Sequence, residues 1–251
     1  MVRLAGGAAE VVVGSATMLS LGAGVLAYAS QWPASQLFGR TLIAGGDGRE
    51  IALTYDDGPN PAATPLLLEV LARDNVRATF FMIGDFVRRE PGLARDVAGA
   101  GHLIANHTLS HPRLSTLSAP RVREELAGCS AVLEDVLGVA VRFFRPPFGA
   151  RRPYVLRAAR ELGLTPVMWN VTGFDWEPIG EERIFSNLAR AITRNQCRGV
   201  GSNLLLHDGG HVDLNAPRRA TVEATARVVA AHRGTQSRFV TVDTWAKAGK
   251  G

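Results

Sequence analysis

The chain has 251 residues, 46% hydrophobic and 20% charged, which is enough for one sizeable hydrophobic core. Its formal net charge of +5 comes almost entirely from arginine, since lysine occurs only at Lys247 and Lys250. These arginines are spread along the chain and form no basic run interleaved with aromatic residues, so we expect no nucleic-acid partner. Cys129 and Cys197 belong to no metal-binding or redox motif, and whether they form a disulfide stays open.

Residues 1–39 are predicted to form a hydrophobic segment and linker ahead of one folded domain over residues 40–251. No charged residue occurs from Val11 to Gly39, and the stretch from Val11 to Ala29 approaches the length that spans a bilayer. One interpretation is membrane association through residues 11–32, with Trp32 at the interface. A second is a signal peptide cleaved after Ala29, and a third is a helix packed on the folded domain. We favour export or anchoring and therefore expect an extracytoplasmic protein, either membrane-anchored or secreted.

Strand-like and helix-like segments alternate after residue 50. Short apolar runs predict strands, and apolar residues three and four positions apart predict helices between them. This alternation implies a parallel sheet, and seven units suit an α/β barrel slightly smaller than the eight-stranded one. A doubly wound open sheet is the alternative, although no GxGxxG follows the first strand. The predicted strands are 51–55, 78–83, 102–106, 141–144, 165–171, 203–206 and 239–242, and the predicted helices include 65–73, 121–137, 154–162, 181–194 and 216–232.

Polar residues that can carry out chemistry collect at the ends of the predicted strands. Asp56 and Asp57 follow the first strand, where Asp-Gly-Pro is also ordinary turn material. Adjacent side chains of an extended segment point to opposite sides, so these two carboxylates can do two different jobs. In a barrel the carboxyl ends of the strands share one face, and that face holds the active site. The other groups are 107–111 after the third strand, 145–149 after the fourth, 175–176 after the fifth and 207–208 at the end of the sixth.

The stretch HTLSH places His107 and His111 four residues apart, either on one face of a helix or within a tight loop. It lacks the Glu of an HExxH zincin, and such a pair can also consist of ordinary surface or capping residues. One carboxylate of the Asp pair would complete a His₂Asp set with an open fourth position for water, the usual plan of a catalytic zinc site. The other aspartate would then be free to take a proton from that water.

Five motifs in this order resemble those of the polysaccharide deacetylases with a NodB homology domain, also known as carbohydrate esterase family 4. The motifs are TYDDG, HTLSH, RPPFG, Asp175-Trp176 and LLLHD, and the resemblance spans roughly residues 50 to 245. It implies a deformed (β/α)₇ barrel and metal-dependent removal of N-acetyl groups from N-acetylglucosamine units of chitin- or peptidoglycan-like chains. The implied partner is therefore an N-acetylated polysaccharide or oligosaccharide.

The resemblance also implies a role for each motif residue. Asp56 would be the general base, oriented by Arg145 through charge and hydrogen bonding. His207 would be the general acid that protonates the leaving amine, with Asp175 beside it to orient the ring and raise its pKa. The implied metal ligands are Asp57, His107 and His111, with zinc as the expected cation and cobalt, nickel or manganese as alternatives. The implied substrate wall contains Pro147, Phe148, Trp176 and Leu205, with a backbone N–H near Phe148 helping to hold the oxyanion.

Thr172 departs from the family pattern, because the fourth motif usually begins with Asp at this position. The base, metal and acid positions are intact, so we expect activity to survive the change. His102 is expected to be a packing residue and His211 a solvated loop residue. Asp208 is expected to hold a loop, and Trp245 to cap the bottom of the barrel.

Two alternatives to the N-acetyl deacetylase are considered. The first is an O-acetyl esterase acting on a xylan-like polymer, or a hydrolase of another amide, since the chemistry at the carbonyl is nearly the same. The second is a non-catalytic carbohydrate-binding barrel, which the intact base, ligand and acid positions make less favourable.

Overall fold

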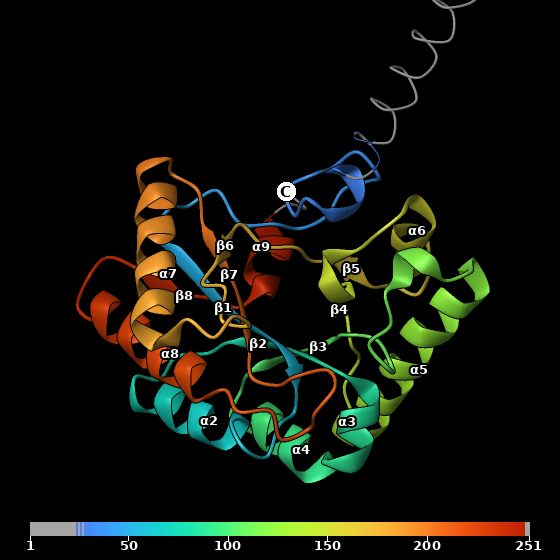
Figure 1. Cartoon of the computed structure of the whole chain (residues 1–251), viewed down its shortest axis with the longest axis horizontal. Helices are drawn as coiled ribbons and strands as arrows, with labels where there is room; N and C mark the ends of the chain where they lie inside the picture. The colour runs from blue at the N-terminus through green and yellow to red at the C-terminus, as the bar shows by residue number, and fades with distance from the viewer. Residues whose placement is uncertain (1–23, 25, 27, 249–251) are drawn as a thin grey trace, which may run out of the picture.

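The centre of the molecule is a parallel β-sheet in the order β5-β4-β3-β2-β1-β7-β6, with β8 paired to the start of β1 (Figure 1). The computed structural model describes residues 24, 26 and 28–248. Helices surround the curved sheet, and this half-open arrangement confirms the predicted deformed (β/α)₇ barrel. The strands are β1 (Glu50–Gly58), β2 (Thr79–Met82), β3 (Leu103–Asn106), β4 (Phe143–Phe144), β5 (Thr165–Pro166), β6 (Val171–Thr172), β7 (Ser202–His207) and β8 (Arg238–Phe239).

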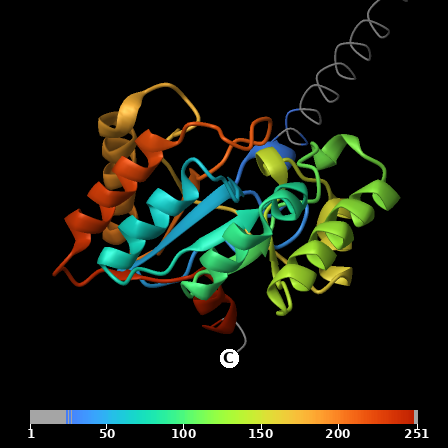
Figure 2. The same cartoon turned by 90° about the horizontal axis from the view of Figure 1, so that it is seen from below.

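Helices cover the outside of the sheet, with α7 against α8, α8 against α2, and α5 against α3 and α6 (Figures 1 and 2). Four of them, α2, α4, α5 and α6, begin with proline in the first turn, where its missing N–H has no partner to lose. Within the described residues, none of the helices has the length and apolar character needed to cross a bilayer. The helices are α2 (Thr64–Arg73), α3 (Gly84–Arg89), α4 (Pro91–Gly99), α5 (Ala119–Leu137), α6 (Pro153–Glu161), α7 (Gly180–Cys197), α8 (Arg219–His232) and α9 (Val242–Ala248).

Strand β1 separates the hydrophobic core from the polar interior of the barrel. Leu53 and Tyr55 belong to the main core beneath the helices, and both are fully buried. Side chains alternate between the two faces of a strand, so Thr54 and Asp56 lie on the opposite face. Both accept hydrogen bonds from the same guanidinium nitrogen, that of Arg145. This alternation carries a charged side chain to the mouth of a buried strand.

Two predicted strands differ from the structure. The run 165–171 divides into β5 and β6, because the backbone N–H of Asn170 bonds the carbonyl of Asn203, and the Asn170 side chain accepts from the Asn203 N–H. Val167, in the same interruption, pairs instead with Leu42. The run 239–242 is also wrong as a strand, since β8 ends at Phe239 and α9 begins at Val242. Helices α3, α4 and α9 are not among the helices predicted from the sequence.

The core beneath α2 offers a matched pair of leucines. Leu67 is fully buried, whereas Leu66, one position earlier, is 45% exposed. We expect Leu67→Ala to lower the free energy of unfolding by about 2–5 kcal/mol, because it removes buried methyl groups and leaves a cavity. Leu66→Ala is expected to change it by no more than about 0.5 kcal/mol. Urea unfolding of the two variants measures this, and equal losses would contradict the packing described here.

Candidate active site

Asp56 and Asp57 both line one cavity at the carboxyl end of β1. The pairing of β1 with β2 shifts register between Asp56 and Gly58, and Asp57 adopts a φ of 72°. This left-handed conformation is tolerated by aspartate more readily than by most residues, and it ends the regular alternation of side chains. The expectation that the two carboxylates point to opposite sides is therefore wrong, because the backbone turn at Asp57 brings both into the same site.

Arg145 lies behind Asp56 and fixes its carboxylate. The fully buried guanidinium donates to Asp56 Oδ1 at 2.8 Å and to the hydroxyl of Thr54 at 2.7 Å. It lies 4.1 Å from the centre of the Phe81 ring, a cation–π contact. Burial lowers the pKa of Arg145, and the adjacent Asp56 charge opposes that effect. With one oxygen held by arginine, Asp56 turns the other toward the cavity, where Oδ2 is 3.8 Å from His107 Nε2.

His107 and His111 come from a tight loop after β3 rather than from a helix. Thr108 and His111 have φ values of 72° and 60°, so the chain curls back on itself. The buried Glu125 of α5 ties the loop down, accepting from the backbone N–H of Ser110 at 2.9 Å and from its hydroxyl at 2.8 Å. The loop therefore presents both imidazoles on the same side, as the spacing predicted.

One oxygen of Asp57 and two imidazole nitrogens form a compact triangle. Asp57 Oδ1 lies 3.4 Å from His107 Nε2 and 3.1 Å from His111 Nε2, and the two nitrogens are 3.2 Å apart. Ligands bound to zinc at about 2.0–2.1 Å in tetrahedral geometry are about 3.3 Å from one another. All three residues are buried, and they form a potential metal-binding group. The triangle therefore has the dimensions that a small divalent cation requires.

The protonation of these groups also suits a cation. His107 Nδ1 donates to the carbonyl of Arg145 at 2.8 Å, which leaves the lone pair on Nε2. Burial lowers the pKa of His111 and favours its neutral form. Burial alone would raise the pKa of Asp57, but contacts with the two histidines hold it well below its usual range. Within the described part of the chain, Asp57 Oδ1 is buried without a hydrogen-bond partner, so a cation there would satisfy it.

His207 and Asp175 form a second polar pair on another side of the cavity. Asp175 Oδ1 accepts from His207 Nδ1 at 2.9 Å, while Oδ2 accepts from the His207 backbone N–H at 2.7 Å. The hydroxyl of Thr221 also donates to Oδ2, at 2.9 Å. Burial alone would lower the pKa of His207, but the charge and hydrogen bond of Asp175 raise it to about 9. His207 therefore carries a proton at neutral pH.

Apolar side chains line the remaining walls of the cavity, whose volume is about 470 Å³. Phe148 and Trp176 are each 44% exposed, and Leu205 is buried. The Trp176 ring meets His207 edge to face, with 5.5 Å between ring centres. Pro147 is buried in the turn that follows β4 and is not among the residues that line the cavity. Arg145 and Asp175 also lie outside the wall, each behind the residue it contacts.

Gly149 of the RPPFG motif lines the cavity beside Phe148, and three residues line it without having been predicted there: Trp169, His211 and Arg218. His211 is an exposed loop residue, as expected, but its ring also stacks on His111 with 4.5 Å between centres. Its loop folds back because Gly210 pairs with Asp213 and Arg218 donates to the carbonyl of Gly209. The only signal for this in the sequence was the closeness of His211 to His207.

Residues expected to support the site lie near it. Asp208 is buried and accepts from the hydroxyl of Thr64 at 2.5 Å, which holds the connection between β1 and α2. Burial, with the charges of Asp57 and Asp56, raises the pKa of Asp208 to about 7. Thr172 accepts a hydrogen bond from the backbone N–H of Phe174 at 3.2 Å, so the loop retains support where Asp is usual.

Other residues from the sequence lie away from the cavity. His102 accepts from the backbone N–H of Ala78, and burial lowers its pKa to about 4, in agreement with a packing role. Trp245 is 5% exposed and donates to Glu50 at the start of β1, so it covers the end of the barrel opposite the site. Cys129 and Cys197 are both free thiols, so they form no disulfide.

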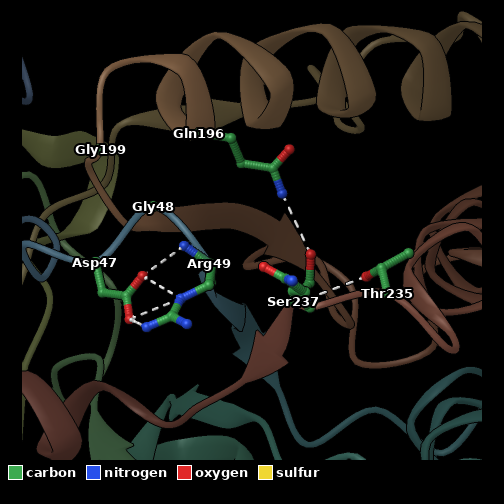
Figure 3. Close-up of a pocket in the computed structure, with 8 residues that line it drawn as sticks. Asp47, Gly48, Arg49, Gln196, Gly199, Thr235 and Ser237 are labelled. Atoms are coloured by element: carbon green, nitrogen blue, oxygen red, sulfur yellow. Dashed lines mark hydrogen bonds and ion pairs between the residues drawn. The ribbon is translucent and has the colours of Figure 1, made fainter.

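A second cavity, of about 450 Å³, lies beside the start of β1 (Figure 3). Its charged side chains pair with one another, since Arg49 donates from Nε to Oδ1 of Asp47 and from Nη2 to Oδ2. Gln196 similarly donates to the hydroxyl of Ser237. The unpaired oxygen of Asp57 and the histidine cluster belong to the cavity at the other end of the strand, which is therefore the candidate active site.

Comparisons with known proteins agree with this assignment. A family model described as "Polysaccharide deacetylase" matches residues 44–167. A chitooligosaccharide deacetylase from Rhizobium leguminosarum bv. trifolii is 37% identical over 195 residues, which cover 75% of this chain and 87% of that protein. A peptidoglycan-N-acetylglucosamine deacetylase from Bacillus cereus is 32% identical over 203 residues, covering 80% and 70%.

The fold leads to the same family. The crystal structure of a peptidoglycan N-acetylglucosamine deacetylase bound to 4-naphthalen-1-yl-N-oxidanyl-benzamide superposes with a TM-score of 0.72 at 30% identity. The superposition covers 81% of this chain and 91% of that one. Sequence and fold together show that the chain belongs to the polysaccharide deacetylase family of metal-dependent hydrolases.

Proposed function

We propose that the protein removes N-acetyl groups from N-acetylglucosamine units of a polysaccharide or oligosaccharide. The observation that carries this proposal is the convergence of three groups on one cavity: the metal-binding triangle, the Asp56–Arg145 pair and the His207–Asp175 pair. An amide is a poor electrophile and an amine a poor leaving group, so hydrolysis needs both an activated water and an acid. These groups supply both.

Asp57, His107 and His111 would hold a divalent cation, for which we propose zinc, with cobalt, nickel or manganese as alternatives. When bound, the cation polarises the acetyl carbonyl and lowers the pKa of a water molecule toward about 7. Asp56, held by Arg145, removes a proton from the attacking water. His207 then donates its proton to the departing nitrogen, which leaves as the free amine while acetate is released.

The walls of the cavity suit an acetyl group. Trp176 and Leu205 provide apolar surface for the methyl group, and the backbone N–H of Phe148 can donate to the developing oxyanion. The two relatives compared above are named for chitooligosaccharide and peptidoglycan N-acetylglucosamine. An O-acetyl esterase would use the same groups. An alkoxide leaves more readily than an amine, so ester hydrolysis depends less on a protonated His207.

Acetate release from a panel of substrates tests the choice between amide and ester. We expect turnover of N-acetylglucosamine oligomers or N-acetylated peptidoglycan, and a much lower kcat/KM on acetylated xylan. Preferential release from the xylan would replace the deacetylase by the esterase. Sugar binding without acetate release from any of the three, by metal-loaded protein, would instead support the non-catalytic barrel.

We propose that this reaction takes place outside the cytoplasm, with the hydrophobic segment serving for export or anchoring. The support comes from the absence of charge between residues 11 and 39 and from the exposed rings of Tyr28 and Trp32. Such aromatic residues suit a membrane interface. Residues 11–23 lie outside the described part of the chain. Fractionation of expressing cells, followed by N-terminal sequencing, distinguishes an anchored chain from one cleaved after Ala29.

The pH dependence should reveal the proton on His207. Because its pKa is raised to about 9, activity should fall as the pH rises through about 9 and the acid is lost. The contact between His207 and Asp175 also stabilises the folded protein. This contribution is complete below a pH of about 6.5, and it is lost as the pH rises through about 9. In Asp175→Asn, burial still lowers the pKa of His207, but the Asp175 charge that raised it is gone. The fall of kcat at alkaline pH should therefore begin at a lower pH. An unchanged pH dependence would contradict the assignment of His207.

A further inference from the structure

Arg151 is a buried charged residue that the proposed mechanism does not use. Its side chain lies at the end of the turn after β4, and it is fully buried. Burial lowers the pKa of the guanidinium. A buried charge is costly unless hydrogen bonds satisfy it, so the partners of Arg151 indicate what it is for.

Those partners join two distant parts of the chain. Nη1 of Arg151 donates to the carbonyl of Gly149 at 3.0 Å, within the turn that carries Phe148. Nη2 donates to the carbonyls of Trp32 and Ser35, at 2.6 and 2.9 Å. The backbone N–H of Arg151 also donates to the carbonyl of Ser30 at 3.1 Å. Residues 30–35, here called the strap, are thus tied to the active-site turn by one side chain and one backbone bond.

The turn needs such support because its backbone is strained. Phe148 and Gly149 adopt consecutive left-handed conformations, with φ values of 57° and 63°. A bulky aromatic residue rarely adopts this conformation, and it persists where its surroundings fix it. A Cβ on Gly149 would lie 2.8 Å from the Trp169 ring, so the turn also fits closely against the cavity wall. On the cavity side, the Phe148 ring meets His111 edge to face at 4.8 Å.

We propose that Arg151 and the strap are positioning elements of the active site, which hold the turn 147–149 in its catalytic conformation. The backbone of Arg145 holds the start of the turn, because its N–H donates to Asn106 and its carbonyl accepts from His107, and Arg151 holds the end of the turn. The strap precedes residues 44–167, which match the family model, so this support comes from outside the matched region. The proposal rests on the deacetylase function only for its effect on turnover; its effect on the turn itself is independent of that function.

The test compares Arg151→Met with Arg152→Met in the full chain. Arg152 is exposed, so it is a matched control one position away. Methionine removes the charge and leaves no buried cation without partners. Arg151→Lys is the second variant, because a lysine keeps the charge but cannot reach three carbonyls in the planar geometry of arginine. Zinc content and unfolding temperature are measured for each, and assays are run well below unfolding.

Two measurements decide the outcome. Amide hydrogen exchange at Gly149 and Ala150, whose N–H groups bond back to Pro146 and Pro147, should become faster in Arg151→Met and unchanged in Arg152→Met. Acetate release by folded, zinc-loaded Arg151→Met should fall by about 10- to 100-fold in kcat/KM, with a smaller loss in Arg151→Lys. Unchanged exchange and unchanged turnover beside a lowered unfolding temperature would overturn the proposal, since Arg151 would then act on stability alone. If the native protein releases no acetate, the deacetylase fails and exchange alone decides the role of the strap.

Discussion

Asp56→Asn is expected to lower kcat for acetate release by about 10²- to 10⁴-fold, the range associated with the loss of a general base. Asparagine keeps the size of the side chain and can still contact Arg145, so the change removes basicity with little change in shape. Asp56 lies beside the metal-binding triangle but is not one of its three members. Metal affinity and KM should therefore change much less than kcat.

Asp135→Asn provides the control for this experiment, because Asp135 is an exposed residue of α5 that belongs to none of the motifs and does not line the cavity. The Asp135→Asn variant should have native activity. If Asp56→Asn retained more than about a tenth of native kcat, another group would have to take the proton, and the base assignment would be wrong. Steady-state kinetics with metal content measured on the same samples separates loss of the base from loss of metal.

His111→Ala is expected to abolish both tight metal binding and activity. The change removes one of the three groups that form the triangle, leaving one imidazole and one carboxylate. Loss of a residue that merely supports a ligand costs about 10–100-fold in metal affinity, so loss of the ligand itself should cost more. Dialysis against a metal buffer, followed by metal analysis, measures the affinity, and cobalt absorption reports the geometry.

His232→Ala is the matched control, since His232 is a partly buried histidine at the end of α8 whose ring contacts the Val228 carbonyl. It should leave the metal content unchanged. Retention of native metal affinity by His111→Ala would show that the cation, if bound, lies elsewhere. A lower affinity with undiminished turnover would show that the metal is not needed for the reaction.

The sequence predicted which residues would meet more reliably than how the backbone would bring them together. Alternating strands and helices imply that polar residues at strand ends share a face, and Asp56, His107 and His207 do so. The pleat of an ideal strand would direct Asp57 away from Asp56, but the left-handed φ of Asp57, at the register shift in β1, turns both carboxylates into one cavity. No periodicity encodes that single conformation.

Contacts between segments that are far apart in the chain could not be predicted from the sequence either. Arg151 donates hydrogen bonds to backbone carbonyls, which every residue possesses. The side chains of residues 30–35 therefore give no indication of this contact. The division of 165–171 into β5 and β6 depends on Asn170 meeting Asn203 across the sheet. His211 reaches His111 only because its loop folds back. Each of these features depends on tertiary contacts that local patterns do not carry.

The central claim is tested most directly by acetate release from N-acetylglucosamine oligomers, using the full chain after metal removal and again after zinc is restored. We expect no release from the stripped protein, recovery on addition of zinc, and failure to recover in Asp56→Asn. Equal release with and without metal would contradict it, as would recovery of native turnover by Asp56→Asn.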